Sequence, residues 1–199
     1  MAVLNPSNFT WGREELKKLF RIWLFVSASL FAGAPELSAQ TEISKEYRVK
    51  AVFLFNFAQF VAWPANAFPN AQTPLTIGVL GDDPFDSFLD ATVQGEKVNG
   101  HPLVIQRYRN LEDAKNCQIL FVSRSENGRM GRILAGLKDR NILTVGDMAG
   151  FAKNGGIVRF VTAQNKIHFR INLAAAKSAN LTISSKLLRL AEIVEPGED

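Results

Sequence analysis

The sequence predicts a single α/β domain with a mostly parallel central sheet flanked by helices, a C-terminal antiparallel hairpin and a closing helix. Short, continuously apolar runs such as "LTIGVL" (75–80) and "ILFVS" (119–123) are typical of strands buried on both faces of a sheet. Helical segments lie between these runs, which is the pattern of parallel strands joined by crossover connections. The chain has 199 residues, which suits one domain at 40–199 with its core at about 45–194.

The expected elements follow in order along the chain. The stretch "EYRVKAVFLFNFAQFVAWP" (46–64) predicts a helix that is apolar on nearly all sides and ends at Pro64. A strand and a Gly-Asp-Asp-Pro turn follow within 74–85, and Pro84 suits the first turn of the next helix. We expect further helices at 85–92, 111–115, 125–140 and 184–194, and further strands at 102–108, 118–123, 142–147, 156–162 and 166–172. The last two strands predict a hairpin around residues 163–165.

The first 39 residues have the pattern of a cleaved secretory signal peptide. A basic region precedes the uncharged, largely apolar run 22–34, and the small residue Ala39 follows it. An uncleaved membrane anchor is the alternative, but this run of roughly 13 residues is shorter than the ~20 residues that span a bilayer. We therefore expect an exported protein whose leader, residues 1–39, is cleaved near Ala39.

Charge and cysteine content exclude two classes of behaviour. The chain carries 23 basic and 19 acidic residues, a formal net charge of +4, and its basic residues are scattered among acidic ones. Nucleic-acid-binding proteins gather their lysines and arginines, so we expect no nucleic-acid partner. Cys117 is the single cysteine, and no internal disulfide can form. Its place before an apolar strand indicates a buried, unreactive thiol, with an intermolecular bridge as the alternative.

Polar residues follow several predicted strands, at the edge where open α/β sheets bind ligands. They are Gly81, Asp82 and Asp83, then Ser123, Arg124 and Ser125, and then Gly146 and Asp147. The same residue types also form strand-to-helix turns and helix caps. The sequence has no phosphate loop, dinucleotide fingerprint, nucleophile elbow or zinc motif, and its two histidines stand in no metal-binding context. We therefore expect no enzyme activity, no metal and no cofactor.

The predicted last strand, "KIHFRIN" (166–172), alternates basic and apolar residues. Lys166, His168 and Arg170 fall on one face, and Arg159 joins them if the hairpin pairs as expected. Four clustered donors suit a carboxylate or phosphate, with arginine as the bidentate partner. A solvent-facing side of an edge strand is the alternative, because charges there discourage aggregation.

Five segments together resemble the YfiR-like family of exported bacterial proteins across residues 45–194. They are the helix 46–64, the strand and turn "LTIGVLGDDPF", the strand "ILFVS", the stretch "ILTVGDMAGFAKNGGIVRF" and the closing segment "KIHFRINLAAAKSANLTISSKLLRLAEIV". The closing segment carries the most specific part of the resemblance, including Asn172, Ala175, Ala176, Leu181 and the run 184–188.

The resemblance implies a periplasmic regulator without catalytic activity. A characterised member binds the periplasmic sensing part of a membrane-bound diguanylate cyclase and holds it inactive, and release of the cyclase raises cyclic di-GMP and promotes biofilm formation. Homodimers are known in the family, and basic residues of the late strand are implicated in binding small ligands. By motif this points to Lys166, His168 and Arg170, together with Arg159, and to an anionic or aromatic ligand.

The aromatic residues of the helix 46–64 are expected to provide dimer or partner contacts. We name Phe53, Phe57, Phe60 and Trp63 for this role. The characterised member also carries internal disulfides, whereas Cys117 stands alone here, so redox control through internal bridges is not expected. Two other functions stay open: a periplasmic solute-binding module that serves another membrane receptor, such as a histidine kinase, and a hydrolase that uses Asp82, Asp83 and Asp147.

Overall fold

The computed structural model describes the backbone of residues 34–164 and 166–195, and side chains from residue 45 onward within these ranges. The sheet and the helical residues from Ser44 onward belong to one compact unit. Residues 1–33 of the predicted leader lie outside the described residues, and residues 34–39 contribute helical backbone only. Cleavage near Ala39 therefore stays a prediction. No helix within the described residues is long and apolar enough to span a membrane.

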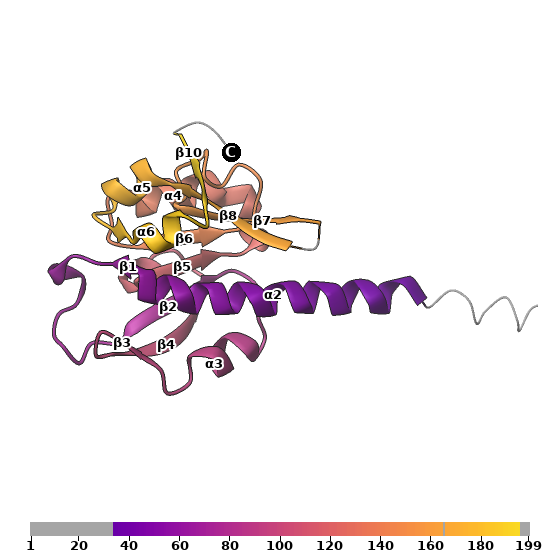
Figure 1. The fold of residues 1–199 in the computed structure, drawn as a ribbon, viewed down its shortest axis with the longest axis horizontal. Helices are drawn as coiled ribbons and strands as arrows, with labels where there is room; N and C mark the ends of the chain where they lie inside the picture. Colours follow the sequence, from indigo (N-terminus) through magenta and orange to yellow (C-terminus); the bar gives the residue numbers. More distant parts are fainter. Residues whose placement is uncertain (1–33, 165, 196–199) are drawn as a thin grey trace, which may run out of the picture. The chain divides into compact units, whose positions relative to one another are not determined.

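Helices lie between most of the described strands, although β3 and β4, and also β6, β7 and β8, follow one another without a helix between them (Figure 1). The α-helices are α2 (Ala34–Phe60), α3 (Phe88–Val93), α4 (Met130–Leu137), α5 (Leu173–Ser178) and α6 (Ser185–Leu188). The 3₁₀ helices are η1 (Ala65–Ala67), η2 (Asp113–Asn116) and η3 (Arg124–Arg129). The strands are β1 (Val61–Ala62), β2 (Leu75–Leu80), β3 (Lys97–Val98), β4 (His101–Tyr108), β5 (Ile119–Val122), β6 (Leu143–Gly146), β7 (Val158–Ala163), β8 (Lys166–Asn172), β9 (Thr182–Ile183) and β10 (Glu192–Val194).

The described residues form an eight-stranded, mostly parallel sheet in the order β10-β8-β7-β6-β5-β2-β4-β3. Strands β4, β2, β5, β6 and β7 run parallel, and β7 and β8 form the predicted antiparallel hairpin. Because β4 and β5 lie on opposite sides of β2, the direction of chain winding reverses at β2, where open sheets form a crevice at their carboxyl edge. The predicted fold class is confirmed.

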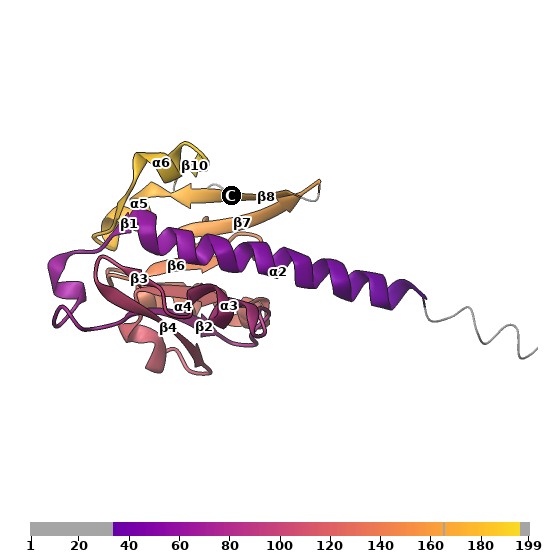
Figure 2. The same ribbon diagram turned by 60° about the horizontal axis from the view of Figure 1, so that its bottom comes forward.

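Both faces of the sheet are covered, as the continuously apolar strands require (Figure 2). On one face α2 packs through Ala51, Leu54 and Phe57, none of which has exposed surface. Its aromatic rings meet the hairpin: the Phe57 ring lies 5.7 Å from that of Phe160 and 5.5 Å from that of Phe169. The other face carries α4, whose buried apolar residues cover β5 and the residues after β6.

The predicted helix 46–64 ends earlier, at Phe60. The two residues after it, Val61 and Ala62, form β1 and pair antiparallel with β9, where Val61 is opposite Ile183. This pairing satisfies backbone groups that a continued helix would have bonded internally. Pairing with a segment more than a hundred residues away is not visible in the local sequence pattern.

The predicted closing helix 184–194 is correct only in its first turn. Ser184 caps α6, since its Oγ accepts a hydrogen bond from the Lys186 backbone N–H. The chain then forms β10, which pairs parallel with β8 and buries Val194. The expected sheet edge is therefore covered by β10 at Arg170–Asn172, whereas the first half of β8, which carries Lys166 and His168, has no described strand on its outer side.

Shortening Phe57 tests the packing of α2 on the hairpin. Phe57→Ala is expected to lower the free energy of unfolding by about 3–5 kcal/mol, because it removes a fully buried ring and leaves a cavity. Val52, on the opposite side of α2, is 48% exposed, and Val52→Ala is the matched control. The control should change the unfolding free energy by less than about 0.5 kcal/mol in urea titrations. Equal losses in the two variants would contradict this packing.

Candidate functional site

The structure brings the four predicted basic residues onto one face of the β7–β8 hairpin. Arg159 is directly opposite Arg170 in the antiparallel register, and His168 and Lys166 follow at alternate positions on β8, opposite Val161 and Ala163. Lys166 and His168 are exposed, while Arg159 and Arg170 are half-buried. We call this set, Arg159, Lys166, His168 and Arg170, the basic face.

A carboxylate also belongs to the basic face. Strand β10 places Glu192 opposite Arg170, and Glu192 Oε2 accepts a hydrogen bond from Arg170 Nε at 2.9 Å. The Glu192 side chain is 62% exposed, so this pair adds little stability but lowers the positive charge near Arg170. The sequence prediction missed Glu192 because it placed this residue in a helix.

The four aromatic residues expected at a partner contact have different surroundings. Phe57 has no exposed surface and belongs to the core, so it offers nothing for another chain to touch in this structure. Phe53, Phe60 and Trp63 are half-buried and pack against the same core. Trp63 Nε1 also donates a hydrogen bond to the backbone oxygen of Gln118 at 3.2 Å. The exposed side of α2 instead carries Val49 and Val52, at 47% and 48%.

A buried charge cluster joins α2 to the carboxyl edge of the sheet. Asp147 directly follows β6, and its Oδ2 accepts hydrogen bonds from Lys50 Nζ at 2.5 Å and from Tyr47 Oη at 2.8 Å. The Lys50 side chain has no exposed surface and also pairs with Glu46 one helical turn earlier. Arg124, which follows β5, lies with its Nε 3.2 Å from Asp147 Oδ1. The cluster thus contains two cations and two carboxylates.

Burial opposes ionisation of Asp147, yet its pKa lies below the usual value. The charge of Lys50 and its hydrogen bond outweigh the burial, and Tyr47 and Arg124 add to the effect. The pKa of the Tyr47 hydroxyl is raised, first by burial and then by the negative charge of Asp147, so it stays a hydrogen-bond donor. This arrangement keeps the carboxylate ionised through the two hydrogen bonds to Oδ2, while the buried Oδ1 lies beside Arg124 without a hydrogen bond from the described residues. A carboxylate held ionised in this way suits a structural role better than proton transfer.

The remaining residues of the carboxyl edge form turns and ion pairs. Gly81 has φ +92°, and a Cβ there would meet Ser125 Oγ at 2.4 Å, so glycine is required. Ser125 Oγ accepts a hydrogen bond from the Asp82 backbone N–H at 2.9 Å. Asp83 accepts from the Phe85 N–H at 2.8 Å, which is the turn function that these residue types allow.

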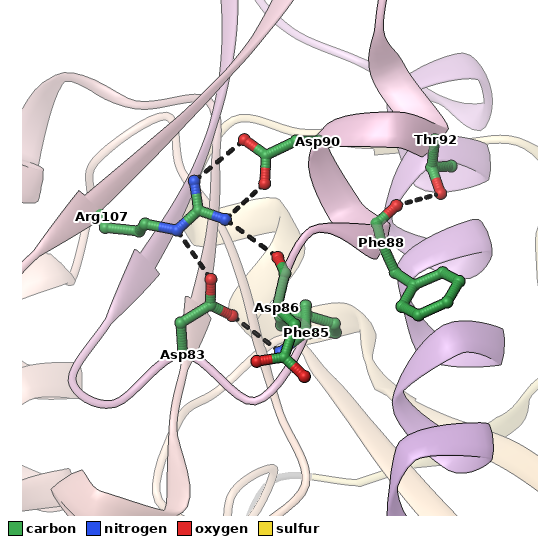
Figure 3. Close-up of polar contacts among 7 residues, drawn as sticks. All are labelled: Asp83, Phe85, Asp86, Phe88, Asp90, Thr92 and Arg107. Carbon is green, nitrogen blue, oxygen red and sulfur yellow. Dashed lines mark hydrogen bonds and ion pairs between the residues drawn. The ribbon is translucent and has the colours of Figure 1, made fainter.

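Arg107, near the end of β4, connects the turn after β2 to α3 (Figure 3). Its Nε donates to Asp83 Oδ2 at 2.7 Å, and its terminal nitrogens donate to both carboxylate oxygens of Asp90 and to the Asp86 backbone oxygen. The carboxylates of Asp83 and Asp147 are therefore held by different cations. This gives no support to the reading in which Asp82, Asp83 and Asp147 act together in hydrolysis.

Cys117 is free and buried, as the sequence predicted. Burial raises the pKa of its thiol to about 12, and its Sγ donates to the Ala114 backbone oxygen at 3.1 Å. A thiol with such a pKa is rarely the reactive thiolate, so the unreactive reading is supported. Among the described residues, no group of three or more His, Cys, Asp or Glu side chains is arranged to hold a metal ion.

Comparison with known protein families identifies the family of residues 47–192. A family model described as YfiR/HmsC-like matches residues 47–192, which is more than half of the chain. The chain belongs to the YfiR/HmsC-like family. A separate comparison with curated proteins finds no match. The matched range includes the basic face and, apart from Glu46, the charge cluster around Asp147.

The sequence reasoning found Asp147 and Arg124 but missed their partners Tyr47, Lys50 and Glu46. The one available signal was the single charged residue, Lys50, inside the otherwise apolar face of a helix. A lysine in that position is costly to bury unless a carboxylate meets it. Residues 46 and 47 each lie about one helical turn before residue 50, so all three fall on the same side of α2.

The lowered pKa of Asp147 makes its contribution to stability dependent on pH. That contribution is complete above the aspartate pKa of the unfolded chain, about 3.9, and is lost as the pH falls through the lower folded value. Asp147→Asn should therefore be less stable than the wild type at pH 7, and the difference should shrink below about pH 4. Urea titrations at several pH values measure this.

Lys50→Met is the companion variant, because it removes the principal cation and should move the acid-induced loss to higher pH. A difference between Asp147→Asn and the wild type that stays constant down to pH 2 would contradict the role of the buried pair.

Proposed function

We propose that this protein is an exported regulator that represses an inner-membrane diguanylate cyclase by binding its periplasmic region, and so controls cyclic di-GMP and biofilm formation. Membership of the YfiR/HmsC-like family over residues 47–192 is the observation that carries the proposal. The protein acts by contact with its partner, as a homodimer in the periplasm, and uses no catalytic group.

The outer side of α2 is the surface that we propose for contact. It combines the exposed Val49 and Val52 with the half-buried Phe53 and Phe60. Aromatic and aliphatic side chains around a partly buried helix are typical of interface centres. Trp63, at the end of the same segment, extends this surface. Phe57 takes no direct part, since it lies in the core.

The basic face is the site that we propose for a small anionic or aromatic ligand. Lys166 and His168 are exposed, and Arg170 and Arg159 lie beside them on the same side of the hairpin. Guanidinium and ammonium groups are the donors that carboxylates and phosphates prefer. Glu192 competes with a ligand for Arg170, so a ligand that binds there displaces a carboxylate that is mostly exposed.

Strand β8 links the proposed ligand site to the proposed contact surface. Its alternate residues face opposite sides: His168 and Arg170 lie on the basic face, while Phe169 between them packs against α2. The Phe169 ring lies 5.5 Å from each of the rings of Phe53 and Phe57. A ligand that shifts β8 therefore acts on the helix that meets the partner, which is a direct route for regulation.

Removing the protein from its host tests the repressor function. Deletion of the gene is expected to raise cellular cyclic di-GMP and surface attachment, and the wild-type gene should restore both. A gene carrying Val52→Glu should fail to restore them, because a charge in an apolar contact is costly to desolvate. Leu190, 70% exposed outside α2, gives the matched control Leu190→Glu, which should complement fully.

Unchanged cyclic di-GMP after deletion, with no inner-membrane protein retained by the tagged chain, would contradict the proposal. Full complementation by Val52→Glu would contradict the contact surface alone.

Chemical-shift titration tests the basic face. Benzoate, an aromatic carboxylate, and inorganic phosphate are the probes, and amide signals of β7 and β8 are expected to move with either one. His168→Gln and Lys166→Gln should each weaken binding about threefold to tenfold, because each removes one exposed donor. Lys177→Gln, on α5, is the control with an exposed lysine elsewhere. Hairpin signals that stay unmoved up to about 10 mM of both probes would count against this site.

A further inference from the structure

A cleft opens at the carboxyl edge of the sheet and shares no lining residue with the basic face. It has a volume of about 420 Å³, which lies within the range of small-molecule sites. The ends of β2 and β4 and the helix η3 form it, with Gly81, Asp82, Asp83, Arg107, Tyr108, Arg109, Glu126 and Arg129 as lining residues. It lies beside β2, where the winding of the sheet reverses, the position at which open α/β sheets bind ligands.

Part of the lining is already neutralised. Asp83 and Arg107 pair with one another, and Arg107 also holds Asp90 outside the cleft (Figure 3). These contacts hold one wall of the cleft in place, and the charges of Asp83 and Arg107 offset one another. They make the wall rigid, since a guanidinium held by three partners has little freedom to move.

Charged groups without such partners remain on the other walls. Within the part of the chain that the structure describes, the carboxylate of Asp82 and the guanidinium of Arg109 make no side-chain hydrogen bond or ion pair, and both residues are exposed. Asp82 and Arg109 therefore give the cleft one negative and one positive charge that no described side chain neutralises. A ligand that carries both charges would meet a partner for each.

Glu126 adds an acceptor at the inner wall. The residue is only 6% exposed, and its Oε2 accepts from Arg129 Nε. Its Oε1 accepts no hydrogen bond from the described residues and faces Gly81, where a Cβ would come within 2.8 Å of it. The missing side chain at Gly81 thus leaves room beside this carboxylate oxygen at the cleft.

The balance of charge selects the class of ligand. Three carboxylates and three guanidinium groups line the cleft. Asp83 is paired with Arg107, and Glu126 with Arg129. The remaining charges are those of Asp82, which repels a simple anion, and of Arg109, which repels a simple cation. We propose that this cleft binds a free α-amino acid, with its carboxylate at Arg109 and Arg129 and its ammonium at Asp82 and Glu126. This goes beyond the proposed function, because it adds a second ligand site remote in sequence from the basic face.

Isothermal titration of the purified protein with each of the twenty L-amino acids tests the proposal. At least one amino acid is expected to bind with a Kd below about 1 mM, while acetate and ethylamine, which each carry half of the recognised group, bind at least about tenfold more weakly. Arg109→Gln should weaken binding of the amino acid about tenfold or more, since it removes the partner of its carboxylate.

Two control variants test whether the amino acid binds at this cleft. Arg132 is exposed on α4 and lines none of the cleft, so Arg132→Gln is the matched control and should bind as the wild type does. His168→Gln, which changes only the basic face, should also leave binding unchanged. Absence of binding by every amino acid at about 10 mM, or binding that survives Arg109→Gln and is lost in His168→Gln, would overturn the proposal.

Discussion

The position of α2 depends on a lysine that the chain buries completely. Moving an ammonium group out of water is costly, so Lys50 can lie on the inner side of the helix only where acceptors meet it. The carboxylate of Asp147 at the end of β6 and that of Glu46 on the same helix provide them. Because Tyr47 donates to the same Asp147 oxygen, two consecutive inward positions of α2 are tied to one point of the sheet. The rotation and the height of α2 on the sheet are then set, and the aromatic contacts with β7 and β8 follow from them.

The same cluster has consequences at a distance along the helix. The Tyr47 ring packs edge-on against Phe85 and Phe121, with centroids 5.5 Å and 6.5 Å away, which connects α2 to the turn after β2 and to β5. Two turns later, Phe53 and Phe57 meet the hairpin. The polar contacts of Tyr47 and the aromatic contacts of Phe53 and Phe57 thus make α2 a connection between the middle of the sheet and its C-terminal hairpin. A buried ion pair adds little net stability compared with apolar packing, so its principal effect here is to specify one arrangement.

Much of the fold could be predicted because its strands are apolar throughout and separated by turns. The runs at 75–80 and 119–122 became β2 and β5, and the alternation of 166–172 gave both the hairpin and its two faces. Predictions that failed involve pairing between segments far apart in sequence. Val61 pairs with Ile183, and Ile193 pairs with Ile171, and each pairing replaced an expected helical end by a strand. Asp147 and Arg124 of the site could be predicted because each follows a strand. Their partners on α2 could not, because the sequence pattern places Lys50 on the inner side of the helix without showing which residue it contacts.

The two outer strands of the eight-stranded sheet bear on how this protein associates with others. At one side β10 spans Glu192–Val194, and at the other β3 spans Lys97–Val98. Neither strand covers the whole of its neighbour: β3 pairs only with His101 and Pro102 of β4, and β10 pairs only with the last three residues of β8. The rest of β4 and the first half of β8 therefore keep an outer backbone edge that neither strand pairs with. Such an edge is a template for strand addition, so a second copy or a membrane receptor has backbone as well as side chains to bind. Backbone pairing reads little sequence, so relatives with the same fold would select different partners through the side chains beside these edges.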